Sequence, residues 1–234
     1  MLYLFPNVLF EEQDHHDFFP TSVEKAVYTI RGLIAEDEKN ARKFLKRFTF
    51  SDGRTFRDIP IRILSEHTAA KEIPELIEMI KAEGDFGLIT DCGLPCLADP
   101  GALLVAKASE QNIKVKTFAG PSSIVMALQL SGFYAQQFTF LGYLPREEAH
   151  LAQKLKEIEK QALSGVVQLF IEAPYRNQKL LEMMIKTLAP HIKLCVACDL
   201  THENEDVVTL PVAKWKGKDT LIYNKRQVVF LISK

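Results

Sequence analysis

The sequence predicts an α/β protein made of two α/β domains. Short apolar stretches of the kind that form buried strands alternate with stretches of helical spacing along most of the 234 residues. That length exceeds one average domain and suits two domains of about 110 residues each. A break that contains glycine and proline, AGPSS, interrupts the alternation near the middle of the chain. We therefore expect a boundary near residues 117–121, with domains at 1–118 and 119–234.

Strands and helices are expected to alternate singly in the first half, which predicts a largely parallel sheet covered by helices. Thr21 or Ser22 is expected to cap the first helix, and Gly84 to end the third. Ser122 can cap the helix at 123–132. The expected strands lie at 2–5, 32–35, 61–64, 86–90 and 113–118. Four helices are expected: one from residue 21 or 22 onward, one at 38–48, one that includes 73–80, and one at 102–112.

The second half also reads as α/β, with antiparallel strands expected near the end. A charged helix at 150–163 comes first. Strands are expected at 166–171, 192–198 and 227–233, and a helix at 177–188 lies between the first two of them.

The composition and the N-terminal residues argue against nucleic-acid binding driven by net charge, against a membrane-spanning helix and against a signal peptide. The formal net charge of −1 gives no global attraction to nucleic acid or to an acidic membrane. No run of about 18 apolar residues is present, as a membrane-spanning helix would need. The first residues, MLYLFPNVLF, lack a basic region and a cleavage site, so we expect a strand there and no signal peptide. These features predict a cytoplasmic protein that does not enter a membrane.

The cysteines and histidines are not expected to bind metal. Cys195 and Cys198 fall in a strand, where residues three apart point to opposite faces. Cys92 and Cys96 lie in a loop, but their spacing is not that of a usual zinc pair. The pair His15–His16, with Asp14 and Asp17, lies in a polar run of the kind that is usually a solvated loop.

Unusual residues collect where the apolar stretches end. In open α/β sheets ligands bind beyond the carboxyl ends of the strands, and glycines let the backbone approach a ligand closely. The sequence has no G-x-G-x-x-G, no P-loop and no G-x-S-x-G, so ordinary dinucleotide-binding, NTPase and hydrolase motifs are absent. The strand-end segments are Glu36–Asp37, 91–101 (DCGLPCLADPG), 120–123 (GPSS), 172–176 (EAPYR) and 199–202 (DLTH).

In order and content, these segments resemble the motifs of the tetrapyrrole methylase superfamily of S-adenosylmethionine (SAM) methyltransferases. Within it, the sequence is most similar to the bacterial 16S rRNA methyltransferases that modify the ribose 2′-hydroxyl of a cytidine. The family's D-A-G-T-P-x-x-S-D-P-G corresponds to 91–101, and its G-P-x-A to 120–123. Its G-F-L-P, E-S-P-H-R and R-E-L-T-K correspond to 142–145, 172–176 and 199–202, and A-A-E-D-T-R to the segment around Glu36–Asp37.

The resemblance implies two α/β domains with SAM in the cleft between them, and a homodimer. It implies that SAM contacts residues of five segments, namely Phe5, Pro6, Gly93, Leu94, Leu97, Ala98, Ser122, Ser123, Glu172, Ala173, Ala197 and Asp199. No metal is implied. The sequence departs from the family in its first loop, FPNVLFEE, which has no glycine and is longer. Leu94 and Ala98 replace the family's threonine and serine.

Methyl transfer to a ribose hydroxyl needs a proton acceptor and groups that hold phosphates. Glu36, Asp37 or Glu172 could accept the proton, and Arg176 could contact a phosphate. The pair Glu36–Asp37 equally suits the start of a helix, where negative charge is favoured. A basic helix face could hold RNA phosphates or simply be solvated. That face consists of Lys39, Lys43, Lys46 and Arg47.

Three functions are compatible with these observations. The first is an RNA 2′-O-methyltransferase that acts on small-subunit ribosomal RNA. The second is a methyltransferase for a small molecule such as a corrin or porphyrin precursor, against which the basic helix argues. The third is a non-catalytic protein that keeps the fold without the cofactor, which the glycine-free first loop would suit.

Overall fold

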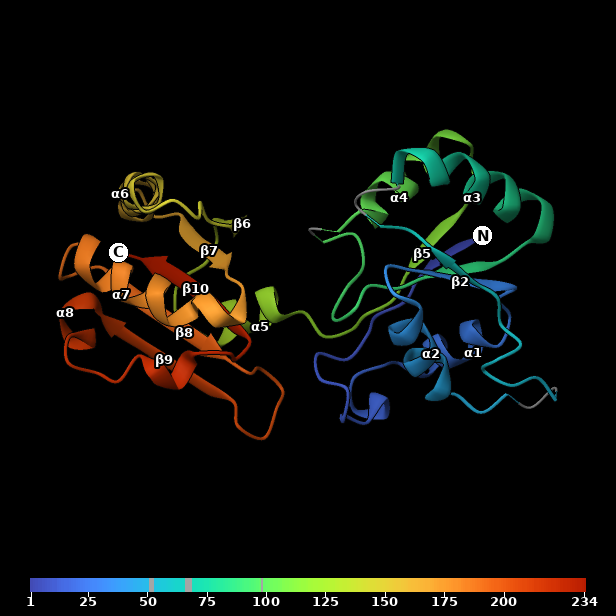
Figure 1. The fold of residues 1–234 in the computed structure, drawn as a ribbon, viewed down its shortest axis with the longest axis horizontal. Coiled ribbons are helices and arrows are strands. Elements are labelled where there is room, and N and C mark those ends of the chain that lie inside the picture. The colour runs from blue at the N-terminus through green and yellow to red at the C-terminus, as the bar shows by residue number, and fades with distance from the viewer. Residues whose placement is uncertain (51–52, 66–68, 98) are drawn as a thin grey trace. The chain divides into compact units, whose positions relative to one another are not determined.

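The computed structural model describes residues 1–50, 53–65, 69–97 and 99–234. Within them the chain forms two compact units, Met1–Ser122 and Ser123–Lys234, and each carries its own sheet (Figure 1). The predicted α/β class is therefore confirmed. The domain limits 1–118 and 119–234 stay a prediction. Among the described residues, no helix combines the length and apolar character needed to cross a bilayer.

The sheet of the first unit is parallel throughout, in the order β3-β2-β4-β1-β5. Its helices follow the strands one by one, as the alternating sequence predicts. The strands are β1 (Leu2–Leu4), β2 (Gly32–Ala35), β3 (Ile61–Ile63), β4 (Phe86–Leu88) and β5 (Val115–Thr117). The helices are α1 (Thr21–Val27), α2 (Glu38–Lys46), α3 (Ala69–Glu83) and α4 (Gly101–Glu110).

Two cores cover the two faces of this sheet. Successive strand residues point to opposite faces, so Leu33 and Ala35 join α1 and α2 in one core, whereas Ile34 joins α3 and α4 in the other. Figure 1 shows α1 and α2 on one side of the sheet, with α3 and α4 on the other. Both faces of β2 are buried, which is why its sequence is a continuous apolar run.

The start of α1 differs from the sequence prediction. Neither Thr21 nor Ser22 caps the helix, because Thr21 is already its first residue and Pro20 occupies the capping position without a side-chain hydrogen bond. Proline suits this position, since its φ is fixed near the value observed, −64°. The expected strands at 86–90 and 113–118 are also shorter, because only three residues of each pair with neighbours.

The sheet of the second unit is mixed, in the order β6-β7-β10-β8-β9. Only β6 and β7 are parallel, and the antiparallel strands expected near the end are confirmed. The strands are β6 (Phe138–Tyr143), β7 (Val167–Ile171), β8 (Lys193–Cys198), β9 (Asp206–Pro211) and β10 (Val228–Ser233). The helices are α5 (Ser123–Leu130), α6 (Glu148–Leu163), α7 (Asn177–Thr187) and the short α8 (Val212–Trp215).

The sequence did not predict β6 and β9, the two edge strands of this sheet. Neither is fully buried, so neither shows a continuous apolar run. The register of β6 shifts between Phe140 and Tyr143, where Gly142 has a φ of +63°. Such irregular edges leave a weak sequence pattern.

The core of the second unit lies between its sheet and the helices α6 and α7. Phe170 and Phe230 stack at 5.9 Å between ring centroids, and Trp215 donates a hydrogen bond to the carbonyl of Leu194. Cys198 belongs to this core. All four cysteines are free, and burial raises the pKa of Cys195 to about 11 and that of Cys198 to about 12. Their thiols are therefore protonated at neutral pH.

Gly120 allows a test of the close packing between the loop after β5 and the loop after β1. A methyl group on Gly120 would lie 2.1 Å from Cβ of Pro6, so Gly120→Ala must push the two loops apart. We expect a loss of about 1–3 kcal/mol in the free energy of unfolding, measured by urea titration. The exposed neighbour Ala119 provides the control, because Ala119→Ser adds one atom in open surroundings. Equal midpoints for the two variants would contradict this account of the packing.

Candidate functional site

The loop after β1 is tied to the loop after β4 by Asn7. The main chains of Asn7 and Gly93 exchange two hydrogen bonds, of 2.8 and 3.1 Å. The buried side chain of Asn7 also donates to the carbonyls of Thr90 and Asp91, at 3.1 and 2.9 Å. These carbonyls lie where β4 ends, and the hydrogen bonds satisfy groups that the sheet leaves unpaired. Asn7 thus fixes one of the segments that the sequence assigns to the cofactor.

The loop 91–101 uses its special residues for backbone geometry. Gly93 and Cys96 both have left-handed φ values, of 76° and 69°. Asp99 accepts hydrogen bonds from the amides of Cys96 and Gly101, at 2.7 and 2.6 Å, and so closes the loop onto the start of α4. Leu97 is 52% exposed, whereas Leu94 is half-buried. The predicted contact Ala98 lies outside the described residues.

Phe5 and Pro6 form the base of this site. Phe5 has no exposed surface, because its ring packs against Phe118 and Phe44, at 5.5 and 5.9 Å between centroids. Pro6 is buried beside Gly120. Both residues therefore shape the loops in this structure, and a ligand would reach Phe5 only if neighbouring groups moved aside.

The predicted proton acceptors Glu36 and Asp37 lie where β2 passes into α2. Glu36 is half-buried, and its Oε1 accepts a hydrogen bond of 3.2 Å from the hydroxyl of Thr90 at the end of β4. Asp37 caps α2 by accepting from the amide of Asn40 at 2.8 Å, and the side chain of Asn40 donates to Asp91 at 2.8 Å. Asp37 thus has a structural role, which leaves Glu36 as the stronger candidate for a base.

The loop after β1 occupies part of the basic face of α2. Lys43 pairs with the carboxylate of Glu11 at 2.5 Å. Arg47 donates to the carbonyls of Gln13 and Glu11, at 2.7 and 2.8 Å. Lys39 and Lys46 are exposed. Lys43 and Arg47, two of the predicted substrate-binding residues, therefore already have partners in the loop after β1.

A small pocket of about 60 Å³ opens beside these contacts. It lies wholly in the first unit, between the loop after β1, helix α2 and the end of β4. Side chains of both charges line it. Its polar and charged lining residues are Asn7, Glu11, Asn40, Lys43, Arg47 and Asp91.

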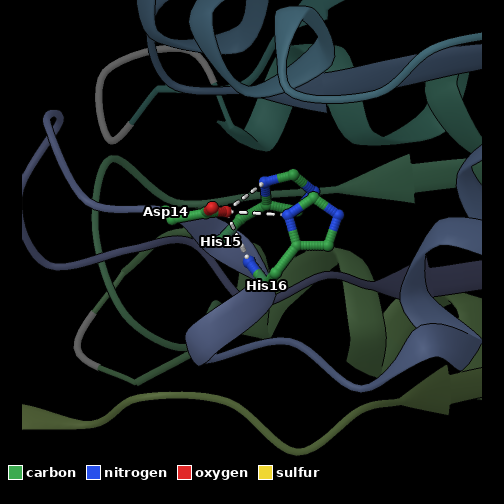
Figure 2. A group of neighbouring side chains, drawn as sticks. All are labelled: Asp14, His15 and His16. Carbon is green, nitrogen blue, oxygen red and sulfur yellow. Dashed lines mark hydrogen bonds and ion pairs between the residues drawn. The ribbon is translucent and has the colours of Figure 1, made fainter.

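Asp14, His15 and His16 come close to one another in the same loop (Figure 2). Asp14 caps a single 3-10 turn, His15–Asp17, by accepting from the amide of His16, and it also lies 2.8 Å from Nδ1 of His16. The ring of His15 is buried against Phe48 and Phe19, and this burial lowers its pKa. Turn formation and packing account for all of these contacts, so we assign no metal here.

In the second unit, Glu172 and Arg176 contact each other within the segment EAPYR. Glu172 is 8% exposed, and its Oε2 lies 3.3 Å from the guanidinium of Arg176. Its Oε1 accepts a hydrogen bond of 2.8 Å from the amide of Ala173. The structure therefore brings together two residues with different predicted roles, Glu172 toward the cofactor and Arg176 toward the substrate.

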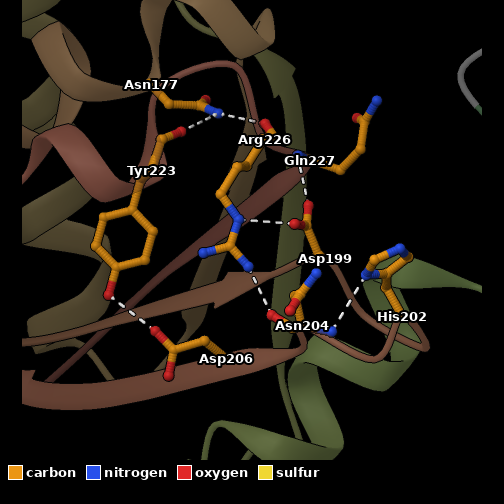
Figure 3. A network of polar contacts seen from close by, with 8 residues as sticks. All are labelled: Asn177, Asp199, His202, Asn204, Asp206, Tyr223, Arg226 and Gln227. Atoms are coloured by element: carbon orange, nitrogen blue, oxygen red, sulfur yellow. Dashed lines mark hydrogen bonds and ion pairs between the residues drawn. The ribbon is translucent and has the colours of Figure 1, made fainter.

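Asp199 is held at the end of β8 by a polar network (Figure 3). Its carboxylate accepts from Nε of Arg226 at 2.7 Å and from the amide of Gln227 at 2.9 Å. Arg226 also donates to the carbonyl of Asn204 at 2.6 Å. Asp199 adopts a left-handed φ of 46°, which these contacts maintain.

The same network connects the segments EAPYR and DLTH. Asn177, at the start of α7, donates to the carbonyls of Tyr223 and Arg226, at 3.3 and 2.7 Å. The amide of Lys225 donates to the carbonyl of Pro174 at 2.8 Å. Residues 223–227 therefore link the two segments, which are about 25 residues apart in the sequence. Ala197 is buried in β8, and Ala173 is half-buried.

Ser122 and Ser123 lie in sequence at the division between the units. Ser122 is buried, and Ser123 is the first residue of α5. Their contacts with a cofactor, and the cap expected from Ser122, stay predictions.

The sequence did not single out the residues that hold the two sites together, above all Asn7, Asn40 and Arg226. Asn7 could have been found, because an amide directly after a strand suits the unpaired carbonyls of a neighbouring strand. Arg226 follows no recognisable motif. Only the pairing of β10 with β8 brings it to Asp199.

Two α/β units with one sheet each are the fold that the resemblance in the sequence implies, and comparison with known families agrees. The family described as Tetrapyrrole (Corrin/Porphyrin) Methylases matches residues 25–215. This match covers most of the chain, so the chain belongs to the tetrapyrrole methylase family.

Among curated proteins, the chain is similar to ribosomal RNA small subunit methyltransferase I from several bacteria. It is 28% identical to the Vibrio cholerae protein over 190 residues, which is 80% of this chain and 62% of the relative. It is 32% identical to the Coprothermobacter proteolyticus protein over 148 residues, which is 63% of this chain and 65% of the relative. The chain thus spans less than two thirds of the length of these relatives.

Solved structures support the fold. The methyltransferase CobJ superposes with a TM-score of 0.64 at 12% identity, covering 100% of this chain and 93% of the other. Diphthine synthase superposes with the same TM-score at 13% identity, covering 99% of this chain and 88% of the other. At these identities the likeness extends to the fold alone.

The role of Asp199 as an anchor can be separated from any role toward a ligand. Asp199→Ala removes the acceptor for Arg226 and Gln227, so we expect the free energy of unfolding without ligand to fall by about 1–3 kcal/mol, measured by urea titration. Glu203→Ala removes a carboxylate from an exposed position four residues away and should change stability by less than about 0.5 kcal/mol. An unchanged midpoint for Asp199→Ala would show that the network does not hold the segment.

Proposed function

We propose that this protein is a SAM-dependent methyltransferase that methylates a ribose 2′-hydroxyl of small-subunit ribosomal RNA. The observation that carries the proposal is the loop 91–101 at the carboxyl end of a parallel sheet, in which Gly93 and Cys96 have left-handed φ values and to which Asn7 and Asp99 give hydrogen-bond partners. This is where α/β sheets bind ligands. The names of the curated relatives supply the class of substrate, and the family supplies methylation.

The first unit offers apolar surface and accessible main chain, both of which suit the binding of SAM. Leu97 offers exposed apolar surface, and Gly93 and Gly120 let the main chain approach closely. Leu94 and Leu97 would then contact the cofactor through apolar atoms, and Gly93 through its main chain. Residues of the second unit would add Glu172, Ala173, Ala197 and Asp199, as the resemblance to the family implies. Two copies of the chain would form a homodimer in the cytoplasm.

SAM supplies an electrophilic methyl group to the reaction. The chain must then orient the ribose hydroxyl and accept its proton. Glu36 is suited to accept this proton, because the contact with Thr90 holds its carboxylate at the end of β4. Lys39 and Lys46 are suited to hold RNA phosphates, because both are exposed on α2. Arg176 would contact phosphate only after it releases Glu172.

Cofactor binding is tested by calorimetry with SAM. We expect saturable heat for the wild type. A carboxylate in place of Leu97 would be desolvated against the ligand, so Leu97→Glu should weaken binding at least about tenfold. Leu103→Glu makes the same change at an exposed position on α4 and should leave the affinity unchanged. No heat from the wild type at millimolar SAM would reject the proposal and leave the non-catalytic alternative.

The acceptor is tested by transfer of the labelled methyl group of SAM to small ribosomal subunits. We expect the label in RNA, and its loss when the target nucleotide lacks its 2′-hydroxyl. The double variant Lys39→Glu/Lys46→Glu should raise KM about tenfold or more, because two phosphate contacts become repulsive. Lys25→Glu, on the exposed surface of α1, is the control and should keep the wild-type KM. No transfer to any ribosomal RNA, free or in subunits, would reject the proposed substrate.

A further inference from the structure

Glu11 pairs with a lysine on the face of α2 that the proposed function assigns to RNA. Its carboxylate accepts a charge-assisted hydrogen bond from Nζ of Lys43. The hydrogen bond from Lys43 lowers the pKa of Glu11, and the charges of Lys39 and Arg47 act in the same direction. Glu11 is therefore a negative charge at neutral pH, directed at a basic surface.

The loop that carries Glu11 is held at both sides of this residue. Before it, Asn7 fixes the chain to the end of β4. After it, the ring of His15 is buried against Phe48. At Glu11 itself and at Gln13, the main-chain carbonyls accept from the guanidinium of Arg47. These contacts thus hold the main chain of Glu11 beside α2, and its place there does not depend on the exposed ion pair alone.

The surroundings of the pair suit a phosphate. Carboxylate and phosphate both accept charge-assisted hydrogen bonds from lysine, at similar distances. The pair borders the pocket of about 60 Å³ that reaches Asn40 and Asp91, close to the candidate base Glu36. Lys39 is exposed one helical turn before Lys43 on the same helix.

We propose that the carboxylate of Glu11 occupies the position at which a phosphate of the RNA substrate binds. Glu11 thereby makes this site selective for RNA over ligands that offer a single phosphate. A tethered carboxylate competes at high effective concentration, so a ligand that offers one phosphate gains little by displacing it. An RNA that also reaches Lys39 and Lys46 gains enough contacts to displace Glu11 from Lys43. This inference rests on the proposed RNA substrate, and it makes Glu11 a residue that determines specificity.

The test compares the binding of a single-stranded uridine oligonucleotide by the wild type and Glu11→Gln, across a series of salt concentrations. Release of Lys43 should tighten binding about threefold to fivefold at low salt. The slope of log affinity against log salt should steepen by at most about 0.7, the value for one phosphate contact on a single strand, because the oligonucleotide displaces Glu11 from Lys43 in only part of the wild type. Asp17→Asn is the control, since its exposed carboxylate makes no ion pair with any described residue of the chain. This control should match the wild type.

A double-mutant cycle shows whether the effect passes through Lys43. Lys43→Gln should change the affinity of the wild type little, but it should abolish the gain in Glu11→Gln. Equal affinity and slope for the wild type and Glu11→Gln, or no binding by either, would overturn the inference. Methyl transfer by the wild type is measured separately. Transfer without a Glu11 effect rejects the inference alone, and a Glu11 effect without transfer to ribosomal RNA rejects the proposed function alone.

Discussion

The candidate site in the first unit depends on one constraint, which is that the polar main-chain groups at the ends of parallel strands need partners. The side chain and main chain of Asn7 meet this requirement for Thr90, Asp91 and Gly93 together. Because these residues are fixed, Asn40 can reach Asp91 and Glu36 can accept from Thr90. A loop without glycine thus keeps this arrangement through a side-chain amide.

In the second unit, an ion pair holds the segment that follows β8. Asp199 directly follows β8 in a left-handed conformation, and it is held by Arg226 and Gln227, which directly precede β10. The two units therefore position their loops by different means, one by a neutral amide and one by an ion pair. The two anchors differ in their sensitivity to salt, which screens the ion pair but not the amide hydrogen bonds.

The sequence predicted those elements that are buried on both sides or strongly amphipathic, such as β2 and α2. It missed β6 and β9, because edge strands are half-exposed and carry no continuous apolar run. It pointed to the candidate site, which stays a prediction, through backbone-specific residues such as Gly93 and Gly120, whose neighbours in sequence already imply a turn. It could not foresee that Lys43 and Arg47 are engaged, since the contacts with Glu11 and Gln13 join segments more than 30 residues apart.

The place of β10 in its sheet has a consequence for synthesis. The strand lies between β7 and β8, yet it follows both of them in the sequence. β7 and β8 consequently become part of one sheet only when residues 228–233 have left the ribosome, and Arg226 reaches Asp199 only then. The sheet of the second unit therefore forms only after residue 233 has been translated, whereas the first unit has every strand of its sheet by residue 117.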